Sequence, residues 1–113
     1  FDSYSAGMKQ KFALIRALLH NPKVLLLDEP AMSLDPAASD ELHAFLRTLT
    51  DKGVTLLCAT HDLAEAETLC DTFIILHQGK VCGCGTLPEL RTAAHVSSGR
   101  LSEIYRSIVK HDA

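Results

Sequence analysis

The sequence contains no long apolar run, no extended basic run, no internal repeat and no low-complexity segment. A membrane-spanning helix needs roughly 20 consecutive apolar residues, and the longest strictly apolar stretches here, such as residues 24–27 and 73–76, are far shorter. The 14 Asp and Glu residues outnumber the 11 Lys and Arg residues, giving a formal net charge of −3. These features argue against a membrane-crossing chain and against a nucleic-acid scaffold.

Paired cysteine motifs are also lacking, because none of the four cysteines lies in a C-x-x-C pair. Cys82 and Cys84 are two residues apart, a spacing that places both side chains on one face of a regular strand. Together with His77 they could bind a metal ion, but the usual ligand spacing is absent. We therefore interpret the cysteines as reduced, partly buried thiols.

What the sequence does contain is the composition and pattern of a folded α/β protein. Its 113 residues are 47% hydrophobic and 22% charged, which is ordinary for a soluble domain. Apolar residues at 8, 12, 15 and 19 follow helical spacing, and the residues before them are expected to form a loop. Short apolar runs at 24–27, 54–59 and 73–77 are typical of buried strands. Residues 81–84 are expected to return as a hairpin partner of the third strand. Further helices are expected over 36–52 and 63–70, after 86 and through 101–108.

Helix boundaries are marked by specific residues. Asp35 precedes Pro36, which is the pattern of an N-cap followed by proline at the first helical position. Gly53 is placed to end that helix. Asp62 and Glu65 resemble a capping box at the start of the next helix. This alternation predicts an α/β fold with a mostly parallel sheet flanked by helices, followed by a small hairpin and terminal helices.

Reactive side chains follow the first two strands. The first strand ends in Asp28 and Glu29, and the second is followed by His61. A lone acid at a strand end is commonly a helix cap or a solvated loop residue, but two adjacent carboxylates after four apolar residues suggest chemistry. One carboxylate suits a hard cation such as Mg²⁺, and the other suits a general base for a water nucleophile.

Four segments, in order, resemble the motifs of ATP-binding cassette (ABC) ATPases. Residues 24–30 resemble the Walker B motif, and residues 4–8 resemble the signature motif. Residues 33–35 are similar to the D-loop, and His61 is similar to the switch histidine. The resemblance covers essentially the whole chain and implies the fold of a P-loop NTPase.

The resemblance implies a role for each residue at the strand ends. Asp28 would hold Mg²⁺ and Glu29 would polarise the attacking water. His61 would contact the γ-phosphate of ATP and position both that water and Glu29.

The resemblance also implies contacts with a second domain. Ser5, Ala6 and Gly7 would lie at the γ-phosphate of ATP bound to that facing domain, where the free N–H groups of the following helix attract an anion. Asp35 would cross the dimer interface, and capping the helix at Pro36 is an equally good and compatible role. Ala6 replaces the first glycine of the usual motif and Met8 its glutamine, a variant similar to that of bacterial drug, lipid and ion exporters.

The phosphate-binding motif G-x-x-x-x-G-K-[ST] is absent, since the only Gly-Lys pair is Gly79-Lys80 and Val81 follows it. The resemblance places that motif upstream of Phe1. We therefore expect the chain to be the C-terminal half of a nucleotide-binding domain over residues 1–96, with an amphipathic C-terminal helix over 97–113. On its own this half is expected to be inactive.

The function that the resemblance implies is ATP hydrolysis by the ATP-binding subunit of an ABC transporter, with export as the expected direction. ATP and Mg²⁺ would be its cofactors. A second ABC ATPase domain and a transmembrane permease would be its partners, with no nucleic acid. The expected location is cytoplasmic, peripheral on the inner face of the membrane. The alternatives are a non-transport ABC ATPase acting on ribosomes or DNA, and an inert degenerate half-domain.

Overall fold

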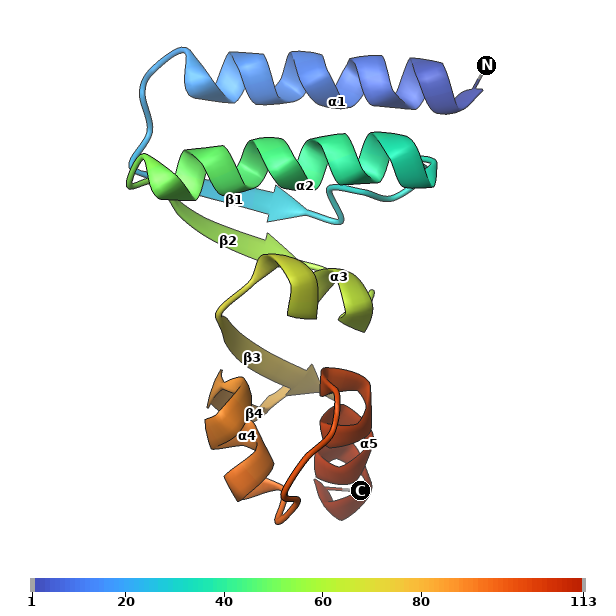
Figure 1. Cartoon of the computed structure of the whole chain (residues 1–113), viewed down its shortest axis with the longest axis vertical. Helices are drawn as coiled ribbons and strands as arrows, with labels where there is room; N and C mark the ends of the chain where they lie inside the picture. The colour runs from blue at the N-terminus through green and yellow to red at the C-terminus, as the bar shows by residue number, and fades with distance from the viewer. Residues whose placement is uncertain (1, 113) are drawn as a thin grey trace. The chain divides into compact units, whose positions relative to one another are not determined.

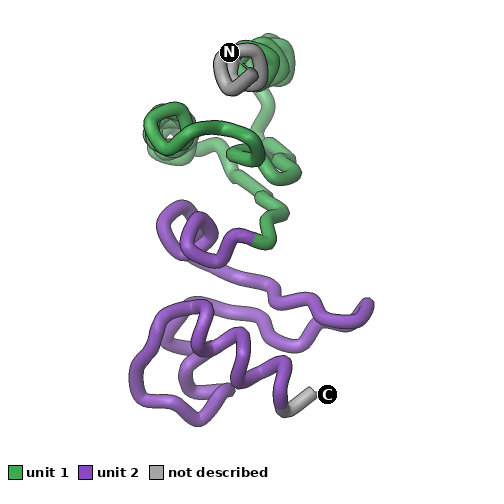
Figure 2. Tube along the Cα trace, turned by 90° about the vertical axis from the view of Figure 1, so that its right-hand side faces the viewer, with its two compact units in different colours: residues 1–61 green, residues 62–113 purple. Residues whose placement is uncertain are grey.

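A computed structural model describes the backbone of residues 2–112 and the side chains of residues 8–110. The chain divides into two compact units, residues 1–61 and residues 62–113, which Figure 2 shows in separate colours. We call residues 1–61 the first unit and residues 62–113 the second unit.

The first unit alternates helices and strands in the order α1 (Asp2–Leu18), β1 (Val24–Asp28), α2 (Pro36–Asp51) and β2 (Thr55–Ala59) (Figure 1). The two strands pair in parallel, with Leu26 opposite Leu57 and Asp28 opposite Ala59. Both strands therefore end at the same edge. Leucines of α1, β1 and α2 form the buried hydrophobic core described in this unit, namely Leu14, Leu25, Leu42, Leu46 and Leu49.

The caps that the sequence predicts for α2 are confirmed. The Asp35 carboxylate accepts a hydrogen bond from the Ala38 N–H at 2.8 Å, and Pro36 is the first helical residue. At the other end Lys52 is the C-cap, and Gly53 follows with a φ of 95°, a left-handed conformation that glycine adopts without steric cost.

The start of α1 differs from the prediction. We expected a loop before Met8, but the helix begins at Asp2. Residues 2–7 contain no proline, Ala6 is the best helix former, and one glycine inside a helix costs only about 1 kcal/mol. Ser5, Ala6 and Gly7 therefore lie in the first two turns of α1, and their side chains lie outside the described residues.

The second unit contains α3 (Leu63–Leu69), β3 (Thr72–His77), β4 (Lys80–Thr86), α4 (Leu87–Ala93) and α5 (Leu101–Asp112). The hairpin of β3 and β4, α4 and α5 share one core made of Phe73, Ile75, Leu90, Ala94, Leu101 and Ile104. Asp62 caps α3 by accepting the Glu65 N–H at 3.1 Å, which is the N-cap half of the predicted capping box. Thr86 and Glu89 form a reciprocal capping box at the start of α4.

The strand pairing corrects one expectation. We predicted that the third strand would extend the parallel sheet, but among the described residues β3 pairs only with β4, antiparallel. The short turn at Gln78 and Gly79 places β4 beside β3, which is the simplest pairing for two adjacent strands. The chain thus has two small two-stranded sheets, and the α/β class with its C-terminal hairpin is confirmed.

The burial of the parallel strands is one-sided. We expected both faces to be covered, but Leu26 is 70% exposed and Leu57 is 57% exposed, whereas Leu25 is buried. The helix α2 contacts β2 (Figure 1). The face that carries Leu26 and Leu57 stays open because no described residue covers it.

The cysteines do not share one face of β4. A β-bulge opposite Ile75 and Leu76 shifts the register, so that Cys82 packs against the core while Cys84 is exposed. All four cysteines lie among the described residues as thiols rather than disulfides, and three of them are partly buried. Across residues 8–110, no three His, Cys, Asp or Glu side chains gather as a metal cluster.

The helix expected near the C-terminus is present as α5, and the division of residues 1–96 from 97–113 stays a prediction. In the described part of the chain, none of the helices combines the length and the apolar character that crossing a bilayer requires.

Candidate functional site

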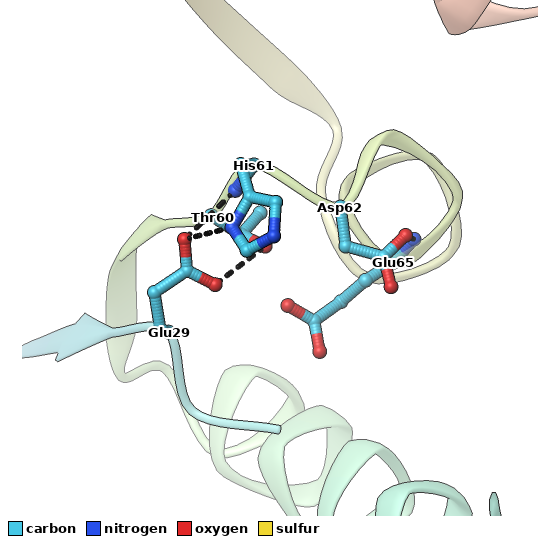
Figure 3. A network of polar contacts seen from close by, with 5 residues as sticks. All are labelled: Glu29, Thr60, His61, Asp62 and Glu65. Carbon is cyan, nitrogen blue, oxygen red and sulfur yellow. Dashed lines mark hydrogen bonds and ion pairs between the residues drawn. The ribbon is translucent and has the colours of Figure 1, made fainter. Parts of the chain in front are cut away.

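The site lies at the carboxyl ends of β1 and β2, where the aligned strands deliver Glu29 and His61 to one place. The Glu29 N–H donates to the Ala59 carbonyl at 2.7 Å, which extends the parallel ladder by one residue beyond Asp28. Thr60 and His61 follow Ala59 directly and face Glu29 (Figure 3). The structure therefore brings Glu29 and His61 together at one edge of the sheet, and the catalytic roles assigned to them stay a prediction.

The Glu29 carboxylate is held on both of its oxygens. Oε1 lies 2.7 Å from His61 Nδ1 and accepts the His61 backbone N–H at 2.9 Å. Oε2 accepts the Thr60 hydroxyl at 3.4 Å. The Glu29 side chain is 27% exposed, whereas the His61 side chain is 77% exposed. The carboxylate is thus anchored by a dipeptide whose imidazole is largely open to solvent.

These contacts hold the pKa of Glu29 below its ordinary value. The hydrogen bond from the His61 side chain is the largest cause, partial burial opposes it, and the His61 N–H and the Thr60 hydroxyl add to it. Glu29 is therefore ionised at neutral pH. An ionised carboxylate can orient a water molecule, polarise it and accept its proton.

The backbone after β1 adopts unusual conformations at two non-glycine residues. Glu29 has a φ of 47° and Ser33 has a φ of 69°. The intervening turn is closed by the Met32 N–H, which donates to the Glu29 carbonyl at 3.1 Å. Any residue other than glycine raises the free energy of the fold when it adopts a positive φ, and such strained residues are concentrated at functional sites. The sequence shows no signal for the strain at Glu29.

Asp28 is the residue that suits a divalent cation. Its carboxylate is exposed at the last position of β1. Both oxygens of the neighbouring Glu29 are engaged by Thr60 and His61, so Asp28 offers the hard oxygen ligand. Mg²⁺ is commonly bound through one or two carboxylates together with water and substrate phosphates. The exposed Asp28 carboxylate fits the role of such a ligand.

The other residues that the sequence predicts for the site lie in α1 and at the start of α2. The Asp35 carboxylate is the N-cap of α2. Ser5, Ala6 and Gly7 lie in the first two turns of α1, and their contacts with nucleotide stay a prediction. Sequence reasoning assigned no role to Thr60, although a hydroxyl residue directly before the histidine is the signal that could have drawn attention to it.

Comparisons with known proteins show what this chain is similar to. A family model described as "AAA domain, putative AbiEii toxin, Type IV TA system" matches residues 1–67. The ABC-type transporter ATP-binding protein EcsA of Bacillus subtilis is 41% identical over 110 residues, which cover 97% of this chain and 44% of that protein.

Two solved structures share the fold. A structure of the ATP-binding subunit of an ABC transporter superposes with a TM-score of 0.83 and 39% identity, covering 91% of this chain and 43% of that one. A dimeric ATP-binding cassette in a post-hydrolysis state, bound to ADP and Pi, gives a TM-score of 0.65 and 32% identity, covering 72% and 35%. The chain therefore spans less than half of the proteins that it matches.

Proposed function

The chain belongs to the ABC ATPases, and we propose that it supplies the water-activating part of an ATP-hydrolysing subunit. The observation that carries the proposal is the contact of 2.7 Å between Glu29 Oε1 and His61 Nδ1 at the aligned ends of β1 and β2. It joins an ionised carboxylate to an exposed imidazole, which together can place a water beside a phosphate.

The proposed mechanism is positioning and electrostatic stabilisation, as in other phosphoryl transfers. Glu29 orients the attacking water with its ionised carboxylate. His61 fixes Glu29 through Nδ1 and its backbone N–H, and its exposed ring reaches toward the terminal phosphate. Asp28 would hold Mg²⁺, which when bound neutralises charge on the phosphates.

A second ABC ATPase domain is the proposed partner. Ser5, Ala6 and Gly7 would meet the γ-phosphate of ATP bound to that domain, near the positive end of the α1 dipole. Asp35 would lie at the interface while it caps α2. The proposal is supported by a similar solved structure, which is a dimeric ATP-binding cassette.

Coupling to a transmembrane permease is proposed on the names of the relatives, which are ABC transporter ATP-binding proteins. In that assembly the chain would lie on the cytoplasmic face of the membrane. The names of relatives include both an export and an import protein. Our proposal of export therefore rests on the signature variant Tyr4-Ser5-Ala6-Gly7-Met8.

The test separates the two adjacent carboxylates in a cassette that carries this chain behind a phosphate-binding half. Glu29→Gln keeps the size of the side chain and removes its charge. Hydrolysis should fall by about 10²–10⁴-fold while ATP affinity is retained. Asp28→Asn should instead weaken Mg²⁺-dependent ATP binding. Turnover and equilibrium ATP binding are measured for both variants beside the unchanged protein.

The separate roles proposed for Glu29 and Asp28 are contradicted if Glu29→Gln hydrolyses ATP at the rate of the unchanged protein. They are equally contradicted if Glu29→Gln loses ATP binding as Asp28→Asn does. Unfolding curves of both variants provide the control, because both side chains are at least partly exposed and their substitution should leave the fold intact.

A further inference from the structure

The Glu29 carboxylate has two oxygens, and they are held by different residues. Both contacts of His61, from its backbone N–H and from Nδ1, are made to Oε1. The Thr60 hydroxyl reaches Oε2 at 3.4 Å. The terminal torsion of a glutamate side chain is broad, so a carboxylate fixed on one oxygen can still turn about that contact. The contact on Oε2 selects the plane of the carboxylate.

Thr60 is suited to this task by its position and its chemistry. It is partly buried, whereas the His61 ring is largely exposed. The Ala59 carbonyl directly before Thr60 accepts the Glu29 N–H at 2.7 Å, so the backbone carrying the hydroxyl is tied to the backbone carrying the carboxylate. Threonine is branched at Cβ and has a restricted χ1 torsion, which fixes where the hydroxyl points.

We propose that Thr60 is a positioning residue that sets the orientation of the Glu29 carboxylate through Oε2, the oxygen that His61 does not hold. This inference rests on the proposed function, since it assigns Glu29 the role of orienting water. The separation of tasks leaves the exposed His61 ring able to engage a phosphate while Glu29 keeps its plane. Hydrogen bonds of catalytic groups are often long without substrate and tighten in the reacting complex, in keeping with the 3.4 Å separation.

The structural test uses the 113-residue chain itself. Thr60→Val removes the hydroxyl and keeps the branched shape, and Thr60→Ser keeps the hydroxyl. Thr55→Val is the matched control, because Thr55 is an exposed threonine at the start of β2, the strand that Thr60 follows. The readouts are the carboxyl ¹³C resonance of Glu29 and the exchange rate of the His61 amide with solvent.

We expect Thr60→Val to move the Glu29 carboxyl resonance and to accelerate His61 amide exchange several-fold, since a turning carboxylate weakens the bond on Oε1. Thr60→Ser should restore both readouts, and Thr55→Val should leave them unchanged. If Thr60→Val leaves both readouts unchanged, the hydroxyl does not hold Glu29 and the proposal is overturned. This outcome does not depend on whether the chain takes part in ATP hydrolysis.

The functional test measures kcat and KM for MgATP in the cassette used for Glu29→Gln. Thr60→Val should lower kcat by about 3- to 30-fold with KM unchanged, since small misplacements of a catalytic group cost up to 10²-fold. Thr60→Ser should recover most of kcat. An unchanged kcat, or a raised KM with kcat intact, would overturn the positioning role, the latter by making Thr60 a nucleotide contact. If Glu29→Gln is itself fully active, the proposed function fails. The resonance and exchange measurements on the Thr60 variants still show whether the Thr60 hydroxyl holds Glu29.

Discussion

Glu29 combines a left-handed backbone, with a φ of 47°, and a carboxylate bound on both oxygens. The first feature costs free energy and the second recovers part of it, because charge-assisted hydrogen bonds are the stronger kind. The residue types at Asp28, Glu29 and His61, and their place at strand ends, could be predicted from the sequence. The backbone strain and the split of the two oxygens between Thr60 and His61 could not, because they depend on how the parallel strands are aligned.

A dependence of stability on pH follows from the lowered pKa of Glu29. A carboxyl group whose folded pKa lies below its unfolded value of 4.5 stabilises the fold above that pH. This contribution is lost as the pH falls through the folded pKa. Glu29→Gln cannot titrate, so the stability advantage of the unchanged chain over this variant should shrink between about pH 5.5 and about pH 3.

The measurement is urea unfolding of both chains across that range, which lies below the ordinary titration of histidine. An advantage that stays constant or grows with acidification would show that the pKa of Glu29 is not lowered in the folded chain.

At the scale of elements, boundaries that depend on local chemistry were predictable. The caps at Asp35, Asp62 and Thr86 satisfy N–H groups within the first turn of their own helices, so sequence alone specifies them. Features that depend on distant partners were not predictable. The bulge that separates Cys82 from Cys84 arises only when β4 pairs with β3.

The cap and the proposed interface role of Asp35 can be separated by two substitutions. Asp35→Ala removes the oxygen that accepts the Ala38 N–H, and should cost about 1 kcal/mol of unfolding free energy. Asp35→Asn retains that oxygen and removes only the charge, so stability should be nearly unchanged. Chemical denaturation of the 113-residue chain measures both. Equal losses for the two variants would show that charge, rather than the cap, stabilises α2.

At the scale of the whole molecule, apolar side chains remain exposed on α1 and on both strands of the parallel sheet in the first unit. The apolar stripe that the sequence predicts is present at Met8, Phe12 and Ile15 on α1 and at Leu19 directly after the helix, and it is open to solvent. The outer face of the parallel sheet exposes Leu26 and Leu57, which are register partners. Periodicity predicts which residues form an apolar face, but it does not reveal whether the same chain covers that face.

We expect the isolated chain to associate with itself through these surfaces, because contiguous exposed apolar area favours contact between molecules. Leu26→Thr combined with Leu57→Thr should reduce this association, since threonine suits a strand and is more polar. Sedimentation velocity over a range of concentrations measures the effect, and circular dichroism checks that the secondary structure persists. Leu25→Thr, at a buried position of the same strand, is the contrasting control and should destabilise the fold. A monodisperse monomer before substitution would contradict this prediction.

The central claim is that Glu29 and His61 act as one unit in ATP hydrolysis, and a double-mutant cycle tests it most directly. The turnover numbers of Glu29→Gln, His61→Ala and the double variant are compared in a cassette that contains this chain. Residues that act as a unit are strongly non-additive, so each single variant should lose about 10²–10⁴-fold in kcat. The double variant should then be no slower than the slower single variant. Losses that multiply in the double variant would contradict the claim, because they would show that the two side chains contribute independently.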